Sequence, residues 1–389
     1  MQPQGAPPPP RRIRVCHVIT RLELGGAQRN TLYTVRHLDR RRFEVSLIAG
    51  RGGMLDGEAE CIPDVTTMFV PPLIRPVHPV SDARALVSLV RIFRRLQPDI
   101  VHTHSSKAGI LGRWAARYAA VPVIVHTIHG YGFHERQAPP VYWLLRASEV
   151  ASARITSHFI TVSRADLDAG VHWGLFPPSR VTLIRSGVEL AAFPSRDRHT
   201  PLHDQLGLTP DAPLVGMVAC LKPQKAPLDF VRLAQRVLAR IQNAHFVLVG
   251  DGDLRARVES EVIDRGLAHC FHMLGWRCDV PAILESLSVF VLTSLWEGLP
   301  RVVPEAMAAG TPVVATRVNG TPEAVADGVT GYLVEPGDIE TMAERIVFLL
   351  QHPAEARCMG QQGHDRVAEF CIDRMVSQQE DLYRELAAR

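Results

Sequence analysis

Two glutamates, Glu297 and Glu305, stand eight positions apart between two apolar runs. The first run, Val289 to Leu292, is apolar throughout, which is typical of a strand buried on both faces of a parallel sheet. From about Arg301 the spacing of apolar residues becomes helical, and this pattern stops at Gly310, the small residue expected just past a helix end. The second apolar run follows, so the predicted order is strand, loop, helix and strand.

In such units, ligands bind outside the carboxyl ends of the strands. This rule places Glu297 in a loop at the site and Glu305 on the second turn of the helix. Backbone N–H groups between Gly298 and Val302 would form the positive end of that helix, which favours phosphate. We therefore expect a site that holds a phosphate on amides and hydroxyl groups on carboxylates, and we favour it over two solvated acids at a helix start. The loop residues expected at the ligand are Gly298, Leu299, Pro300 and Arg301.

The stretch EGLPRVVPEAMAAGTPVVAT resembles the signature of glycosyltransferase family 4, whose members are retaining enzymes of the GT-B fold. Two glutamates at this spacing are common by chance, but the Gly-Leu-Pro, Glu-Ala-Met and Gly-Thr-Pro-Val-Val context makes the match specific. The resemblance implies that Glu305 holds the ribose hydroxyls of a nucleotide and that Glu297 holds the hydroxyls of the donor sugar. It extends over nearly everything from about residue 13 onward.

The first half of the chain carries two further motifs. Gly25 and Gly26 lie between the first predicted strand and the first predicted helix, where paired glycines serve either a tight turn or a close approach to an anion. The resemblance favours the second, because family members place a glycine loop here against the donor diphosphate. His129, in the stretch HTIHG, resembles the family's histidine motif, which implies a position against the donor sugar and a role in catalysis.

A metal site is the alternative for the histidines of this region. His102 and His104 alternate along a predicted strand, but no carboxylate partner motif and no HExxH spacing accompany them. We therefore expect a metal-independent protein with no cofactor, and hydrogen-bonded structural roles for such histidines as His126. His129 and His134 are the other histidines that a metal could use.

Two lysines follow the first strand predicted in the second half. Lys225 matches the family's lysine, and a cation there can neutralise a departing diphosphate. The family has arginine five residues earlier, where this chain has Cys220. Lys222 is a hypothetical substitute for that arginine. Together with His129 and Glu297, Lys225 completes the expected catalytic set.

Two more loops are expected at the donor. The glycine pair ending at Gly252 lacks the third glycine of the dinucleotide fingerprint, so a nicotinamide oxidoreductase is disfavoured. The resemblance implies that Gly252 faces the donor and that the loop holding Trp276 and Arg277 reads the nucleobase. A packing role for Trp276 fits equally well.

Length and alternation define the architecture. At 389 residues two domains are expected, and strands alternate with helices as in doubly wound parallel sheets. We predict an α/β protein of GT-B type, with two Rossmann-like domains facing across a cleft. The predicted parts are a disordered Pro-rich tail (1–11), an acceptor-side domain (12–190), a nucleotide-sugar-binding domain (191–371) and a terminal helix crossing back to the first domain (372–389).

Composition limits the partners. A net charge of +3 is too small to indicate nucleic acid. The seven cysteines lack CxxC spacing, and neither a secretion signal nor an apolar run of membrane-spanning length occurs, so we expect a cytoplasmic protein. The segment from Ala83 to Leu96 is either an amphipathic face for the anionic inner surface of the plasma membrane or, as we favour, a helix packed on the sheet with its arginines in solvent.

These observations predict a metal-independent, retaining hexosyltransferase. It would move a sugar from a nucleotide donor, expected to carry UDP, to a glycan or a lipid-linked acceptor in polysaccharide or glycolipid biosynthesis. The alternative is a nucleotide-sugar epimerase or a non-catalytic nucleotide-sugar-binding protein on the same fold, which the missing arginine at Cys220 keeps open.

Overall fold

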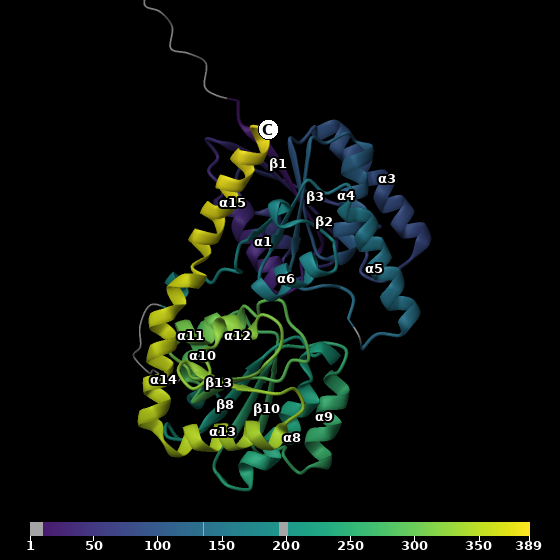
Figure 1. Ribbon diagram of the computed structural model, residues 1–389. Helices are drawn as coiled ribbons and strands as arrows, with labels where there is room; N and C mark the ends of the chain where they lie inside the picture. The colour runs from purple at the N-terminus through teal and green to yellow at the C-terminus, as the bar shows by residue number, and fades with distance from the viewer. Residues whose placement is uncertain (1–10, 135, 194–200) are drawn as a thin grey trace, which may run out of the picture. The chain divides into compact units, whose positions relative to one another are not determined.

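The computed structural model describes residues 11–134, 136–193 and 201–389. Its contacts divide the chain into two compact units (Figure 1). Unit 1 contains the described residues up to Thr161, then Leu167–Ile184 and Val376–Arg389, and unit 2 contains Val162–Asp166 and Arg185–Met375. Apart from Arg11, the Pro-rich tail predicted over residues 1–11 lies outside the described residues.

Unit 1 is built on a seven-stranded, fully parallel sheet in the order β3-β2-β1-β4-β5-β6-β7. Along the chain, β2 and β3 are added on one side of β1, and β4 to β7 are added in turn on its other side. The direction of winding therefore changes between β1 and β4. The strands are β1 Ile13–Arg21, β2 Phe43–Gly50, β3 Val65–Phe69, β4 Ile100–His104, β5 Val123–Ile128, β6 His158–Thr161 and β7 Val181–Leu183.

Helices cover both faces of this sheet (Figure 1). Helix α4 packs against both α3 and α5. In α3 the buried residues are Ala85, Leu89 and Phe93, which join the core and leave the arginines of the helix outside. The helices of unit 1 are α1 Gly26–His37, α2 Asp56–Glu60, α3 Pro79–Leu96, α4 Ser106–Tyr118 and α5 Pro139–Ala153, together with the parts of α6 (Arg164–His172) and α15 (Ile372–Ala387) that belong to this unit.

Unit 2 repeats the plan with six parallel strands in the order β10-β9-β8-β11-β12-β13. Strand β11 is buried at every position, as its unbroken apolar run predicts. The strands are β8 Leu214–Val218, β9 His245–Val249, β10 Phe271–Gly275, β11 Val289–Leu292, β12 Val313–Thr316 and β13 Gly331–Val334. The helices are α7 Pro201–Leu206, α8 Pro227–Leu238, α9 Arg255–Asp264, α10 Val280–Ser286, α11 Val302–Ala308, α12 Thr321–Ala324, α13 Ile339–Gln351 and α14 Pro353–Arg366.

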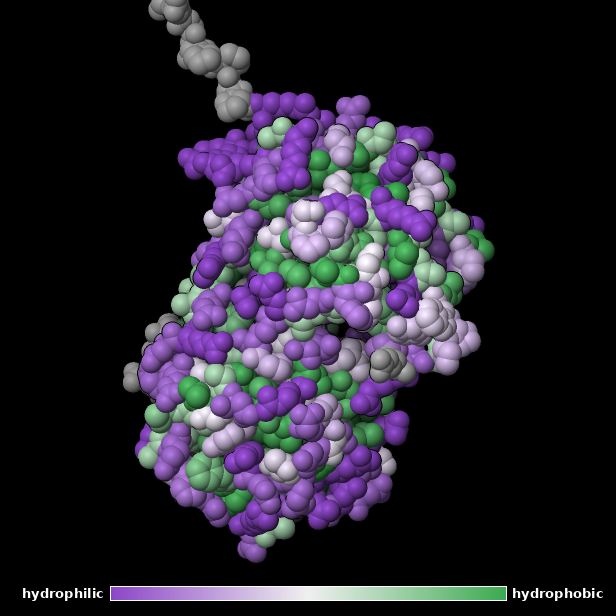
Figure 2. Space-filling model, in the orientation of Figure 1, coloured by the Kyte–Doolittle hydropathy of each residue, from purple (hydrophilic) through white to green (hydrophobic). Residues whose placement is uncertain are grey.

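The predicted pair of doubly wound parallel sheets is confirmed. Two short strands at sheet edges, β7 and β13, carry too few residues for a period to show and were not predicted. In the described part of the chain no helix is both long enough and apolar enough to cross a membrane. Hydrophilic residues cover most of the face drawn in Figure 2, with hydrophobic residues in small groups between them.

Candidate active site

The direction of winding in unit 2 changes between β8 and β11, which are neighbours in the sheet. The loops that follow these two strands leave the same edge and diverge, and parallel α/β sheets bind ligands at such a point. Lys225 lies in the loop after β8, in a short 3-10 turn over Pro223–Lys225. Glu297 lies in the loop after β11, and the two side chains meet in an ion pair.

The two carboxylate oxygens of Glu297 have different partners. Oε1 accepts a hydrogen bond from Lys225 and a second one, 2.5 Å long, from the hydroxyl of Ser294. Oε2 lies 3.5 Å from the side-chain amide of Gln224, the long limit for a hydrogen bond. A carboxylate oxygen has two lone pairs, so Oε2 is the oxygen with capacity left for a ligand hydroxyl.

Backbone and side-chain hydrogen bonds join the two loops. The backbone N–H of Leu295 donates to Gln224 O at 2.8 Å, and the Gln224 amide donates to Trp296 O at 2.9 Å. Thr293 donates through Oγ1 to Lys225 O at 2.8 Å. These bonds fix the positions of Lys225 and Glu297 relative to each other, although the two residues lie in different loops.

A third loop, after β12, supports the Glu297 loop from the other side. The side chain of Asn319 accepts a hydrogen bond of 3.1 Å from the backbone N–H of Glu297. Asn319 has φ of +40°, a backbone conformation that asparagine tolerates better than most residues. Gly320 donates to Gly298 O at 3.0 Å, and a Cβ at position 320 would stand 2.1 Å from that oxygen. Only glycine permits this approach.

Glu305 lies in the first turn of α11, because the helix begins at Val302 and ends at Ala308. The prediction of a second-turn position was therefore wrong by one turn. Arg301, at the N-cap position, pairs with Glu305 at 3.2 Å. Both side chains are largely buried, at 14% and 18% exposed, so the pair holds the Glu305 carboxylate close to the start of the helix.

The other predicted donor contacts of unit 2 also follow strands. Gly252, after β9, stands so close to Leu221 that a Cβ would lie 2.8 Å from Leu221 O. Arg277, after β10, is bound by Asp279 at 2.8 Å and by Gln205 at 3.2 Å, and Trp276 is 37% exposed. Lys222 and Cys220 are half-buried in the loop after β8, and in the loop after β11 Gly298, Leu299 and Pro300 are buried.

The corresponding edge of unit 1 carries the glycines and His129. Gly25 is the N-cap residue of α1, and within the described residues this helix start has neither a side-chain cap nor an acid in its first turn. His129 directly follows β5 and is half-buried. Burial lowers the pKa of its imidazole to about 4, so the ring is neutral at physiological pH.

His129 adjoins a group of buried histidines that the sequence indicates only in part. His17 on β1 and His102 and His104 on β4 are 0%, 0% and 3% exposed. Burial lowers the pKa of His17 to about 3 and the pKa values of His102 and His104 well below the ordinary value. His17, His102 and His104 each offer a nitrogen within 4.8 Å of the others, which makes them the candidate metal ligands of the described chain.

Four residues of these sites were not predicted. Ser294, Gln224 and Asn319 act through contacts between loops that are far apart in sequence, which no local pattern reveals. His17 had a weak signal, since a histidine inside the first apolar strand is unusual.

Two family models match the chain. Residues 24–192 match the model described as "Glycosyltransferase Family 4", and residues 212–352 match the one described as "Glycosyl transferases group 1". An Escherichia coli protein, UDP-Gal:alpha-D-GlcNAc-diphosphoundecaprenol alpha-1,3-galactosyltransferase, is 33% identical over 377 residues, which cover 96% of this chain and 97% of that protein. The putative glycosyltransferase EpsD of Bacillus subtilis is 28% identical, over 83% of this chain and 86% of its own length.

Solved structures share the fold. Anabaena Alr3699/HepE in complex with UDP and glucose superposes with a TM-score of 0.82 at 20% identity, covering 96% of this chain and 100% of that one. Sucrose-phosphate synthase from Thermosynechococcus elongatus gives a TM-score of 0.84 at 24% identity, covering 97% and 100%. With two parallel Rossmann-like units, a paired lysine and glutamate between β8 and β11, and these matches over almost its whole length, the chain belongs to glycosyltransferase family 4 and has the GT-B fold.

Proposed function

We propose that this protein is a retaining hexosyltransferase that moves a sugar from a UDP-linked donor to a lipid-linked acceptor without a metal ion. The observation that carries the proposal is the Lys225–Glu297 pair at the point where the winding of unit 2 reverses. The relative from Escherichia coli, whose name specifies a UDP-sugar donor and a diphosphoundecaprenol-linked acceptor, supports both substrate classes.

The proposed chemistry follows from charge. Breaking the bond between sugar and phosphate leaves negative charge on the diphosphate, and a fixed cation lowers the energy of that state. Lys225 supplies the cation, held in place by Glu297. Glu297 Oε2 would receive sugar hydroxyls, Glu305 ribose hydroxyls, and the loop from Gly298 to Arg301 the phosphate.

Retention needs either a covalent intermediate or attack from the face that the leaving group vacates. The two oxygens of Glu297 are turned to Lys225, Ser294 and Gln224, which suits a role in binding rather than as a nucleophile. We therefore assign the front-face route, through a short-lived ion pair.

Unit 1 would supply the acceptor side, the glycine loop at Gly25 and Gly26, and His129. A membrane contact is proposed for α5, where Val141, Trp143 and Leu144 are 47%, 59% and 66% exposed. The guanidinium of Arg146 lies over the Trp143 ring, 5.3 Å from its centroid, so a cation accompanies the apolar surface. An exposed aromatic ring accompanied by an arginine suits the interface of an anionic bilayer.

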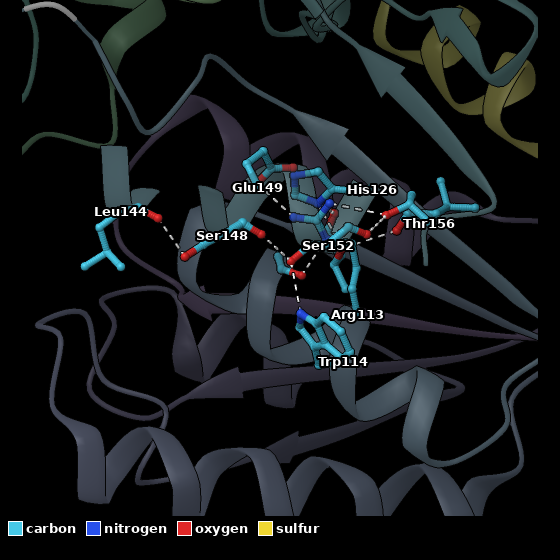
Figure 3. A network of polar contacts seen from close by, with 11 residues as sticks. Arg113, Trp114, His126, Leu144, Ser148, Glu149, Ser152 and Thr156 are labelled. Carbon is cyan, nitrogen blue, oxygen red and sulfur yellow. Dashed lines mark hydrogen bonds and ion pairs between the residues drawn. The ribbon is translucent and has the colours of Figure 1, made fainter. Parts of the chain in front are cut away.

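A network of polar contacts joins α5 to α4 (Figure 3). Arg113 of α4 is fully buried and donates to Glu149 of α5 at 2.9 Å, and also to Thr156 at 3.3 Å. Trp114 donates to Ser152 of α5 at 3.2 Å. These contacts hold the carboxyl half of α5, whereas the exposed Val141, Trp143 and Leu144 lie in its amino half. None of the seven cysteines, whose positions all lie in the described part of the chain, forms a disulfide; this suits a reducing compartment, and we propose the cytoplasmic face of the plasma membrane.

Assays of UDP release, with and without a polyprenyl-diphosphate sugar, test the activity. We expect release from one UDP-hexose to rise on addition of the acceptor, and the new linkage, read by NMR, to keep the anomeric configuration of the donor. An epimerised donor, or binding without turnover, would instead favour the epimerase or the binding protein. If Lys222 replaces the missing arginine, Cys220→Arg adds little. A marked rise in Cys220→Arg would identify a weakened transferase.

Vesicle flotation tests the membrane contact. Trp143→Ser with Leu144→Ser should reduce binding to vesicles containing anionic lipid, while Ile263→Ser, which removes an equally exposed apolar side chain of unit 2, should not. Equal binding by all three proteins would exclude α5 as the contact.

A further inference from the structure

Three histidines of unit 1 form a continuous hydrogen-bonded row. Nδ1 of His17 lies 3.1 Å from Nε2 of His104, and Nδ1 of His104 lies 3.2 Å from Nε2 of His129. They come from three neighbouring strands or their ends, β1, β4 and β5. The row therefore runs across the point where the winding of unit 1 reverses and ends at the residue expected to touch the donor sugar.

The rings point at each other end to end. His17 and His104 have ring planes only 8° apart and centroids 5.3 Å apart, although their nearest nitrogens are 3.1 Å apart. Face-to-face stacking would bring the centroids closer together than this, so the rings lie nearly in one plane. His104 and His129 have centroids 5.5 Å apart and planes 34° apart. Each contact is thus a directed hydrogen bond between ring nitrogens.

Neutral rings give such a row a direction. Each contact needs one N–H and one lone pair, and a neutral imidazole has one of each, so His104, which uses both ring nitrogens in the row, donates at one and accepts at the other. If His17 donates to His104, then His104 must donate to His129, and His129 keeps its proton on Nδ1. If His129 donates through Nε2, every bond in the row reverses.

The far end of the row decides between the two directions. Nε2 of His17 is buried and has no hydrogen-bond partner among the described residues. Orphaned buried N–H groups are rarer in proteins than under-used acceptors. An unprotonated Nε2 is therefore the better state, and it requires His17 to carry its proton on Nδ1 and to donate toward His104.

We propose that His17 and His104 are positioning residues that fix His129 in the tautomer protonated at Nδ1, so that it donates a hydrogen bond to an oxygen of the bound sugar nucleotide. This rests on the proposed function only for the identity of the acceptor oxygen. His129 then acts as a neutral donor rather than as a proton acceptor. The relevant nitrogen is Nδ1, the one that the row leaves for a ligand.

A metal centre at His17, His102 and His104 is the competing interpretation. Three ligands must direct lone pairs at one point, whereas His17 and His104 direct their nitrogens at each other. His102 also has both ring nitrogens in hydrogen bonds, with the hydroxyls of Tyr383 and, at 2.6 Å, Thr127. The geometry therefore favours the row over a metal site.

Nitrogen-15 NMR of the histidine-labelled full chain tests the proposal directly, because protonated and unprotonated ring nitrogens have distinct shifts. In the wild type we expect His129 to carry its proton on Nδ1. His104→Leu should abolish this preference and lower kcat about tenfold, the value of one oriented hydrogen bond, with the affinity for UDP unchanged. His104→Gln, whose amide can accept from His17 and donate to His129, should restore most of both.

His126→Leu is the matched control, since His126 is equally buried on β5 but binds Thr103 and not the row. His126→Leu should leave the tautomer of His129 unchanged and kcat within about twofold of the wild-type value. His129 protonated at Nε2 in the wild type, or unaltered in His104→Leu, overturns the proposal. If the purified wild type contains one equivalent of metal and His102→Leu contains none, the proposal is overturned in favour of a metal centre. Absence of sugar transfer by the wild type would refute the proposed function, while the NMR result would still decide the row.

Discussion

The buried histidines should make unit 1 sensitive to mild acid. A group whose native pKa lies below its unfolded value binds more protons when unfolded, so its contribution to the free energy of unfolding falls as the pH drops below the unfolded value. For His17 and His129 the native pKa values are about 3 and about 4, against 6.5 when unfolded. The sensitive window therefore runs from about pH 6.5 down to those native values.

The size of the effect follows from the width of that window. Between pH 7.5 and pH 5.5 each such histidine should cost about 1.4 kcal/mol of unfolding free energy, so His17 and His129 together cost about 3 kcal/mol. The shifts of His102, His104 and His126 act in the same direction. This loss is a large part of the 5–15 kcal/mol that typically stabilises a native protein.

Urea unfolding at the two pH values, followed by tryptophan fluorescence and circular dichroism, measures the loss. His17→Leu should reduce the difference between the two pH values by about 1.4 kcal/mol, because it removes one proton from the unfolding reaction. Val18→Ala, a fully buried neighbour on β1, should destabilise at both pH values by roughly 1–4 kcal/mol and keep the full difference. Equal stability at pH 7.5 and pH 5.5, or an undiminished difference in His17→Leu, would refute the reasoning.

Three further predictions concern the site and its support. Glu305→Ala should weaken the binding of UDP about tenfold, as expected for the loss of a charge-assisted hydrogen bond, and calorimetry that finds unchanged affinity would rule out its role at the ribose. Lys225→Ala should lower turnover by about a hundredfold or more, the usual effect of losing one donor to a developing oxyanion. If Lys222 replaces the family's arginine, Lys222→Ala should lower turnover by a similar factor. Wild-type turnover in Lys222→Ala would show that Lys222 does not act in the site. Arg113→Leu should destabilise unit 1 by about 3–5 kcal/mol, because it leaves Glu149 buried and unpaired. The double variant Arg113→Leu with Glu149→Leu should recover most of that loss. Unchanged thermal unfolding of Arg113→Leu would contradict the structural role of the pair.

Local pattern was sufficient for most of the fold. Strand β11 was predicted to the residue because its four apolar positions are all buried between two layers of helices. The end of α11 was marked by Gly310, which has φ of +68°. The start of α11 was less well defined: Arg301 has helical dihedral angles but lies at the N-cap, so the helix begins one residue later than predicted and Glu305 falls in its first turn.

The candidate site residues could be proposed singly from the sequence, but their arrangement could not. Spacing, context and the family resemblance pointed to Glu297, Lys225 and His129 one at a time. The ion pair between Lys225 and Glu297 depends on β8 and β11 being neighbours although β9 and β10 intervene in the sequence, and the same is true of His17 and His104 on β1 and β4. Such pairings arise from the order of strands in a sheet, which the local pattern of residues does not encode.

The last helix places a constraint on how the protein is made. Residues of α15 from Val376 onward belong to unit 1, where Glu380 accepts from the backbone of Asp39 at 2.7 Å and the fully buried Tyr383 bonds to His102. His102 and Tyr383 are 281 positions apart, so the ribosome must complete unit 2 before it releases the residues that finish unit 1. Although amino-terminal domains usually fold first during synthesis, here the first unit to emerge waits for α15, and Tyr383 can cover His102 only after unit 2 has been synthesised.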